Sequence, residues 1–431
     1  MANRDLQADT GSLARRLSRL RSVRGLRHGV SIPPDGAAPP GARLAPHPPR
    51  GVRGIEDLLS GELLSTRHGT CFLHREAYPL SHPHGHLSLS SLVAHPPTHP
   101  ALLARDERLA AVDLRRLAFV DTETTGLAGG TGTYAFLIGV GLFRDEAFEL
   151  YQFFMRDYVE EPAQLTALGE LLDSMEAVVS FNGKSFDLPL LETRFLMARQ
   201  PPRLVGAPHL DLLPVARRLW KYRLESCALS ALEPAVLGVR RTRADVPGWL
   251  IPSLYADYAR TGDASEMPRI FYHNAQDILS LVTLAAHLCD IVAEPALYDA
   301  TLPGEDLYGL GRLLLDLGDT RRAEAAYVRA ASECRNHVGE RAMRDLAALL
   351  KRQERRDQAV AWWQSLSATY DSVEACEELA KHHEWHTGDL PQAVAWTERA
   401  LALTHAWPPG SRRRDTLAAL EHRLARLQRK Q

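Results

Sequence analysis

Between residues 116 and 200, the pattern of apolar and polar positions is of two kinds. Short apolar runs rich in β-branched and aromatic residues predict strands, and segments of helical spacing lie between the later ones. The first three runs, "RLAFVDTE", "TYAFLIGVGLF" and "FELYQFFM", have turn-rich connections and predict an antiparallel meander. The next three segments, "EPAQLTALGELLDSM", "AVVSFN" and "SFDLPLLETRFLMARQ", predict helix, strand and helix. We therefore expect an α/β domain with a mixed sheet and flanking helices.

From residue 303 onward the strand patterns disappear and a helical repeat takes their place. The segments "AEAAYVRA", "AVAWWQSL" and "AVAWTERA" place Ala323, Ala359 and Ala393 at intervals of 36 and 34 residues. This is the period of tetratricopeptide repeats, which are helix-turn-helix units. The small Gly311, before Ala323, would let paired helices approach closely, and the third unit needs one inserted residue near "HTGDL". We expect an all-α, tetratricopeptide-like domain over 303–428, with an ordinary helical bundle as the alternative.

The N-terminal part has a different composition. Residues 30–50 contain seven prolines and predict a disordered linker that follows an arginine-rich tail. The expected organisation is a disordered basic tail and linker over 1–50, an irregular N-terminal cap over 51–104, and the mixed α/β domain over 105–292.

Composition restricts the class of protein. With 431 residues, 45% of them hydrophobic, the chain can form two or three globular domains. The five cysteines are scattered without a CxxC pair, which favours free thiols in the cytoplasm. No run of 18 apolar residues predicts a membrane span, although the basic leader also has features of a mitochondrial presequence. The net charge of −2 neither supports nor excludes a nucleic-acid partner.

Candidate chemistry begins at the end of the first strand. Asp121 and Glu123 are at i and i+2, so their side chains should project from one face of the sheet. Paired carboxylates repel each other and are stabilised by a hard cation such as Mg²⁺ or Mn²⁺. Two later segments add to them: "SFNGKSFDLPLL" carries Asp187, and "FYHNAQDILSL" carries His273 and Asp277.

With these motifs in order, the chain resembles the DEDD exonucleases of the ribonuclease H-like superfamily, and most closely the YprB-like bacterial family. The resemblance rests on "DTETTGL", "FNGKSFDLPLLETRF", "HLDLL", "DVPGWLIPSLY" and "YHNAQDILSL", roughly residues 116–290. It implies that two Mg²⁺ or Mn²⁺ ions are held by Asp121, Glu123, Asp187 and Asp277. One ion would activate a water and the other would stabilise the leaving 3′ oxygen.

The catalytic base is where this chain departs from the superfamily pattern. Members carry a histidine five residues before the last aspartate or a tyrosine four before it, but here Tyr272 is at minus five and His273 at minus four. Four residues turn a helix by about 400°, which keeps His273 on nearly the same face as Asp277. We therefore expect His273 to be the base, with a helix-start role as the alternative and Tyr272 as the other candidate.

Further residues are candidates for substrate contact. In the superfamily the segment after the first motif often contacts the terminal nucleotide. In the second motif, an asparagine and a lysine could hold phosphate or the turn itself, with a plain solvated lysine as the alternative. The corresponding residues are Thr124, Thr125, Leu127, Asn182 and Lys184. The glycines at 126, 129, 130 and 132 favour a hairpin loop with positive φ over a phosphate-binding loop, because no helix follows them.

Three weaker patterns have plain alternatives. His68, Cys71 and His74 have a spacing that zinc could use, but loop histidines are the simpler interpretation. His209 and Asp211 could support the site or simply end a strand. The segments "RRLWKYR" (217–223) and "RRTR" (240–243) could follow a nucleic-acid backbone or be solvated charge.

Together these observations predict a metal-dependent 3′ to 5′ exonuclease that acts on DNA or RNA, with a single-stranded 3′ end as the expected substrate. The repeats would dock a protein partner or brace the catalytic domain, and no membrane partner is expected. The alternatives are a structure-selective endonuclease with the same site and a non-catalytic nucleic-acid-binding scaffold.

Overall fold

The computed structural model describes residues 53–126, 131–203, 205–242, 244–293 and 302–431. The predicted tail and linker over 1–50, and Leu127 with Gly129 and Gly130, lie outside the described residues.

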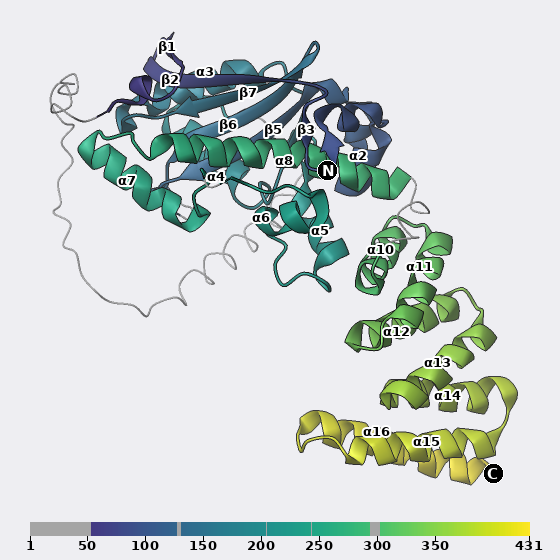
Figure 1. Cartoon of the computed structure of the whole chain (residues 1–431). Coiled ribbons are helices and arrows are strands. Elements are labelled where there is room, and N and C mark those ends of the chain that lie inside the picture. The colour runs from purple at the N-terminus through teal and green to yellow at the C-terminus, as the bar shows by residue number, and fades with distance from the viewer. Residues whose placement is uncertain (1–52, 127–130, 204, 243, 294–301) are drawn as a thin grey trace, which may run out of the picture. The chain divides into compact units, whose positions relative to one another are not determined.

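A seven-stranded mixed sheet forms the core of the α/β part (Figure 1). Its strand order is β1-β2-β7-β6-β5-β8-β9, antiparallel from β1 to β5 and parallel from β5 to β9. The predicted meander is confirmed as β5 (Leu117–Thr124), β6 (Ala135–Arg144) and β7 (Ala147–Phe154), and the parallel strands are β8 (Ala177–Ser180) and β9 (His209–Asp211). The strand β5, which contains Asp121 and Glu123, is thus a central strand with a neighbour on either side.

The sheet continues into the segment that was expected to be an irregular cap. There β1 (Glu62–Thr66) and β2 (Gly69–Pro79) form a hairpin, and β2 pairs antiparallel with β7 along eight residues. The description of this part as irregular is therefore wrong. Cys71 to His74 are all buried, so β2 lacks the alternation of buried and exposed residues that identifies a strand. The charged residues that follow them in β2 are more typical of a loop. The rest of the segment forms η1 (Ile55–Asp57), β3 (Pro83–His84), β4 (Leu87–Ser88), η2 (Leu89–Ala94), α2 (Thr98–Ala104), η3 (Glu107–Ala111) and η4 (Leu114–Arg116).

Helices cover both faces of the sheet. On one face lie α3 (Glu161–Leu172) and α4 (Asp187–Met197), whose apolar side chains form one core with the even-numbered residues of β5. On the other lies α8 (Met267–Ala293), which forms a second core with the odd-numbered residues. Because side chains alternate between the two faces along a strand, the odd-numbered residues at the end of β5 face α8, and the even-numbered ones face α3 and α4.

The long helix α8 can approach β6 because two glycines stand beneath it. A Cβ on Gly141 would lie 2.6 Å from Cγ2 of Ile278, and one on Gly139 would lie 2.1 Å from Oδ1 of Asn274. By length and hydropathy α8 could span a membrane, but 78% of its most apolar 18-residue window is buried inside the fold. Its apolar character is explained by its place in the core.

The elements that complete the α/β part lie mostly between β9 and α8. They are η5 (Tyr158–Glu160), α5 (Leu212–Trp220), α6 (Leu229–Leu232), the π-helix η6 (Glu233–Leu237), η7 (Gly248–Leu250) and α7 (Ile251–Thr261).

The C-terminal region contains helices and, over the described residues 302–431, no strand. Its helices are α10 (Gly304–Asp316), α11 (Thr320–Glu333), α12 (His337–Arg352), α13 (Arg356–Tyr370), α14 (Val373–His382), the π-helix η8 (His383–Thr387), α15 (Leu390–His405) and α16 (Ser411–Lys430). The all-α prediction is confirmed. The three repeated alanines are fully buried in α11, α13 and α15, and a Cβ on Gly311 would lie 2.7 Å from the Tyr327 ring. The π-helix η8 ends within "HTGDL", the segment where the repeat register would need one inserted residue.

Candidate metal centre

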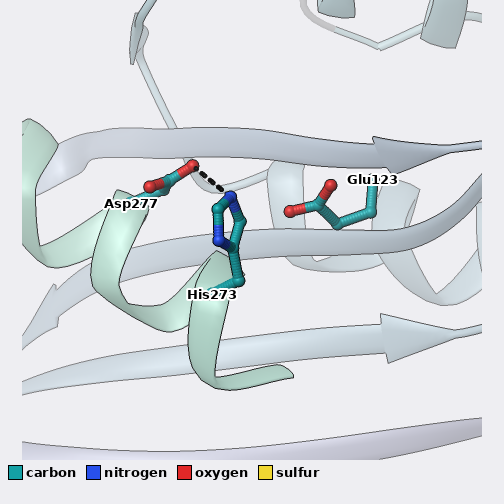
Figure 2. Close-up of side chains that lie close together, drawn as sticks. All are labelled: Glu123, His273 and Asp277. Atoms are coloured by element: carbon teal, nitrogen blue, oxygen red, sulfur yellow. Dashed lines mark ion pairs between the residues drawn. The ribbon is translucent and has the colours of Figure 1, made fainter. Parts of the chain in front are cut away.

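Two elements bring titratable side chains together at the end of β5. Glu123 extends from β5, and His273 and Asp277 extend from successive turns of α8 (Figure 2). One ligand atom of each lies within 4.8 Å of the other two. Two carboxylates and an imidazole at this spacing form a donor set that suits a divalent cation.

Asp121 lies beside this cluster and is held by α8. Nδ2 of Asn274 donates to Oδ2 of Asp121 at 2.8 Å, and Oδ1 of Asn274 accepts from Nε2 of Gln152 at 2.9 Å. The second contact fixes the orientation of the amide, so its NH₂ group must face Asp121. Gly139 is paired with Asp121 across the sheet, and its missing side chain leaves the space that Asn274 occupies. The sequence analysis did not identify Asn274 or Gly139 as part of the site.

Asp187 approaches from the opposite face. It is the first residue of α4, and its Oδ1 accepts a hydrogen bond from the hydroxyl of Thr122, the residue between the two acids of β5. Burial raises the pKa of Asp187 to about 6. Asp187 is therefore near the other acids but is not part of the three-residue cluster with Glu123.

The electrostatics of the acids fit a bound cation. Burial, followed by repulsion from Asp277 and Asp187, raises the pKa of Asp121 well above its ordinary value. Burial and the charges of Asp121, Asp277 and Asp187 do the same for the pKa of Glu123. Buried like charges that raise one another's pKa are relieved by a divalent ion, which would be held by Asp121, Glu123 and Asp277, with Asp187 adjacent.

His273 is oriented by an aspartate that the sequence analysis did not single out. Nδ1 of His273 lies 2.7 Å from Oδ1 of Asp245, and Nε2 lies 3.6 Å from Oδ2 of Asp277. The same Nδ1 lies 3.1 Å from Nη1 of Arg241, so Asp245 and Arg241 together hold this edge of the ring and leave Nε2 directed at Asp277. The phenol of Tyr272 points elsewhere and accepts from the backbone N–H of Thr242 at 3.2 Å. In the sequence, Asp245 could have been noticed as the first residue of "DVPGWLIPSLY", one of the segments that carry the family resemblance.

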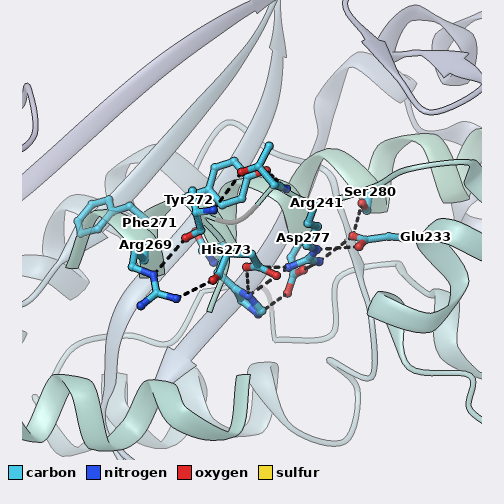
Figure 3. Close-up of polar contacts among 12 residues, drawn as sticks. Glu233, Arg241, Arg269, Phe271, Tyr272, His273, Asp277 and Ser280 are labelled. Carbon is cyan, nitrogen blue, oxygen red and sulfur yellow. Dashed lines mark hydrogen bonds and ion pairs between the residues drawn. The ribbon is translucent and has the colours of Figure 1, made fainter. Parts of the chain in front are cut away.

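Arg241 enters the cluster from the loop before Asp245 (Figure 3). It forms an ion pair with Asp277 and a two-bond ion pair with Glu233. The segment "RRTR" was considered as a nucleic-acid surface, but Arg241 is buried in the site, Arg240 is exposed, and the residue at 243 lies outside the described residues.

Of the candidate substrate-contacting residues beside the first two acids, Thr124 ends β5 and Thr125 follows it, whereas Leu127 lies outside the described residues. Thr124 is buried and its hydroxyl donates to the carbonyl of Gly126 at 2.9 Å, and the hydroxyl of Thr125 accepts from the backbone N–H of Tyr134 at 3.0 Å. These bonds close the β5–β6 hairpin. Neither Gly126 nor Gly132 has a positive φ, so in the described part of the loop the turn does not depend on that conformation.

The second turn presents its polar side chains to solvent. Asn182 and Lys184 are exposed, and Asn182 has a φ of 70°. Their backbone N–H groups donate to the carboxylate of Asp211 at 2.7 and 3.2 Å. His209 lies 2.7 Å from the hydroxyl of Ser180 through Nε2. Asp211 and His209 therefore stabilise the second-motif turn from β9, which is more than an ordinary strand end.

The possible zinc site has a different explanation. Cys71 and His74 are on β2, so they do not belong to a loop as expected. Burial raises the pKa of the Cys71 thiol to about 12, and His74 Nδ1 contacts the carbonyl of Ser60 at 2.5 Å. Among the residues that the structure describes, the group with Glu123 is the one whose ligand atoms are close enough to hold a metal.

The segment "RRLWKYR" packs on the C-terminal helices. Arg223 forms a two-bond ion pair with Asp306 at 2.8 Å, and Arg218 pairs with Asp316, both on α10. Arg218 and Arg223 therefore take part in packing against α10. The nucleic-acid surface and the solvated charge considered for this segment do not describe these two side chains. An exposed aromatic residue follows the backbone that lies beside His273: a Cβ on Gly248 would be 3.8 Å from Nε2 of His273, and the next residue, Trp249, is 73% exposed.

Comparison with known proteins agrees with this architecture. Residues 118–289 match the family model of the RNase H superfamily, a range that includes all four acids and His273. The chain is 30% identical over 339 residues to a protein of Bacillus subtilis (strain 168) described as uncharacterized protein YprB, and the match covers 77% of this chain and 80% of that protein. RNase H-like domains are typical of nucleases that use divalent metals. The chain therefore belongs to the same family as the Bacillus subtilis YprB protein and contains an RNase H superfamily domain.

Proposed function

We propose that this protein is a divalent-metal-dependent 3′ to 5′ exonuclease that hydrolyses the phosphodiester bonds of DNA or RNA. The observation that carries the proposal is the convergence of Asp121 and Glu123 on β5 with His273 and Asp277 on α8. The end of β5 and the helix α8 are more than 140 residues apart in the chain, and together they present buried acids that repel one another.

Asp121, Glu123, Asp187 and Asp277 are the proposed ligands. Two Mg²⁺ or Mn²⁺ ions, when bound, would supply Lewis acidity to the attacked phosphate and to the departing 3′ oxygen. Asn274 holds one oxygen of Asp121 and so leaves the other to face an ion. Thr122 similarly engages one oxygen of Asp187.

His273 is the proposed general base. Its Nε2 lone pair accepts a proton from the attacking water, and the Asp245 carboxylate stabilises the resulting imidazolium through Nδ1. Tyr272 is the less suitable candidate because its hydroxyl is bonded to the backbone at Thr242.

The substrate is proposed to enter over the two turns, with a single-stranded 3′ end near His273. Thr124, Thr125 and Leu127 would approach the terminal nucleotide, and Asn182 and Lys184 would approach phosphate. The exposed indole of Trp249 offers a face on which a base can stack.

The segment limits are proposed as 1–50, 51–104, 105–292 and 303–428, with 51–104 adding β1 and β2 to the sheet of the nuclease domain. The last segment is proposed as a tetratricopeptide-like region that docks a protein partner or braces the nuclease domain. The fully buried alanines of α11, α13 and α15 support the repeat interpretation. A cytoplasmic location is proposed from the free cysteines, none of which forms a disulfide within the described residues.

The test uses 5′-labelled single- and double-stranded DNA and RNA with Mg²⁺, Mn²⁺ or a chelator. The wild-type protein should produce a ladder that shortens from the 3′ end, and Asp121→Ala should abolish it. Glu421→Ala, an exposed residue on α16 of the C-terminal helices, is the control that shows whether purification of a variant by itself changes activity.

Three results would contradict the proposal in different ways. Full activity of Asp121→Ala would refute the site. Cleavage of circular substrates would favour the endonuclease. Mn²⁺ binding without digestion of any polymer would favour the non-catalytic scaffold.

A further inference from the structure

Arg241 is a buried cation in contact with a proposed metal ligand. Its side chain is 9% exposed, and one of its guanidinium nitrogens, Nη2, donates to Oδ1 of Asp277. Its Nη1 lies 3.6 Å from Oδ1 of Asp245. The guanidinium therefore places a permanent positive charge against Asp277 (Figure 3).

A second carboxylate anchors this arginine. Glu233 accepts from Nε and from Nη2 of Arg241, each at 2.7 Å, in the fork geometry that makes arginine–carboxylate pairs strong. The Glu233 side chain is 2% exposed, and its Oε1 also accepts from the hydroxyl of Ser280 at 2.7 Å. Ser280 in turn lies 2.8 Å from Nε2 of His84. The anchor is thus itself held by α8 and by the β3–β4 hairpin.

Arg241 also contacts Asp245 and, through Nη1 at 3.1 Å, Nδ1 of His273, but the two carboxylates that accept its shorter hydrogen bonds, Glu233 and Asp277, hold it unequally. Glu233 holds the guanidinium by two hydrogen bonds, whereas the Asp277 contact uses one nitrogen. If Asp277 bound a metal ion in place of Arg241, the arginine would keep both hydrogen bonds to Glu233. It would therefore not become an unpaired buried charge, which would be costly in free energy. Release of Asp277 therefore requires little rearrangement.

We propose that Arg241 is a built-in counter-ion that competes with divalent cations for Asp277, and so regulates metal occupancy of the site. This inference rests on the proposed metal-dependent function. In the ion-free protein Arg241 offsets the repulsion among the acids, and Glu233 keeps it within reach. When ions bind, Asp277 exchanges the guanidinium for a metal, and the arginine stays on Glu233.

The test measures Mn²⁺ binding by titration calorimetry and by the electron paramagnetic resonance signal of free Mn²⁺, without any substrate. Arg241→Gln alone would leave Glu233 buried and unpaired, so the main variant is the double substitution Glu233→Gln with Arg241→Gln, in which two amides can pair. Its Mn²⁺ dissociation constant should be at least about tenfold lower than that of the wild type, which corresponds to about 1.4 kcal/mol.

Two controls make the result specific. Arg240→Gln removes the same charge from the exposed neighbouring residue and should change the dissociation constant by less than about twofold, because solvent screens it. Asp277→Asn should weaken Mn²⁺ binding in both backgrounds. Circular dichroism and urea unfolding show that each variant is folded before the titrations.

The outcomes separate this inference from the proposed function. Mn²⁺ binding that depends on Asp277 but is unchanged or weaker in the double variant would overturn the role of Arg241 and leave the metal site intact. An absence of Mn²⁺ binding in the wild type and in the double variant would overturn both. Tight binding in the double variant with weaker binding in the wild type would support the role of Arg241 and the metal site on which the proposed function depends.

Discussion

Oδ1 of Asp245 lies 2.7 Å from Nδ1 of His273, although the two residues are separated by 28 positions in the chain. Asp245 is in turn positioned by Arg269, whose Nη2 donates to its backbone carbonyl at 2.8 Å. The imidazole of His273 is therefore fixed in one orientation with Nε2 toward Asp277, before any substrate arrives.

Replacing Asp245 by asparagine should lower kcat by about 10- to 100-fold, because a base in the wrong tautomer loses most of the 10²- to 10⁴-fold contribution typical of such groups. KM and the dissociation constant for Mn²⁺ should change little, because Asp245 is not a proposed ligand. Nitrogen NMR of the labelled imidazole would report the tautomer directly. An unchanged kcat in the variant, with a changed tautomer, would remove His273 from the role of base.

The contact of Asn274 with Gly139 predicts a coupled pair of stability effects. Gly139→Ala would place a methyl group 2.1 Å from Oδ1 of Asn274, so it should destabilise the protein by about 1 to 3 kcal/mol, as overpacking does. In an Asn274→Ala background the same substitution should cost clearly less, because the obstructing amide is gone. Urea unfolding of the four proteins gives this coupling energy. Strict additivity would show that α8 does not pack on β6 as described.

Trp249 should contribute to oligonucleotide binding by stacking. Trp249→Ala is expected to weaken binding of a short single-stranded oligonucleotide by about 5- to 150-fold, which corresponds to the 1 to 3 kcal/mol of one base–aromatic contact, and Trp249→Phe should weaken it less. Fluorescence anisotropy in a Glu123→Gln background avoids cleavage during the measurement. The matched control is Trp385→Ala, because Trp385 is also exposed, at 56%, but belongs to the C-terminal helices. Equal effects of the two alanine variants would contradict a stacking role for Trp249.

His209 should make stability fall on acidification. Burial, reinforced by the charge of Lys184, lowers the pKa of His209 to about 4, whereas an unfolded histidine titrates near 6.5. Above pH 6.5 both states are neutral, and between pH 6.5 and 4 only the unfolded state takes up the proton, so stability decreases by about 1.4 kcal/mol per pH unit. This contribution is absent in His209→Gln, which can still bond to Ser180. The difference in unfolding free energy between wild type and variant should therefore shrink from pH 7 to pH 4.5, and a difference that is constant with pH would contradict the assignment.

Much of the fold could be predicted because it depends on local patterns. The apolar runs that form β5, β6 and β7 and the helical spacing of α3 and α4 are properties of a few adjacent residues. The strand β2 was missed because its neighbours bury both of its faces, and burial on both faces removes the alternation that identifies a strand.

By itself, the sequence determined which residues can share a face. The two-residue step from Asp121 to Glu123 in a strand, and the four-residue step from His273 to Asp277 in a helix, follow from backbone geometry alone. Only the tertiary structure decided what those faces meet. It placed Asp187 on the opposite side of the sheet against Thr122, and it brought Asp245 and Arg241 to α8. Such contacts depend on how loops and helices pack across the sheet, and no local spacing in the sequence encodes which distant side chain will complete a hydrogen bond or an ion pair.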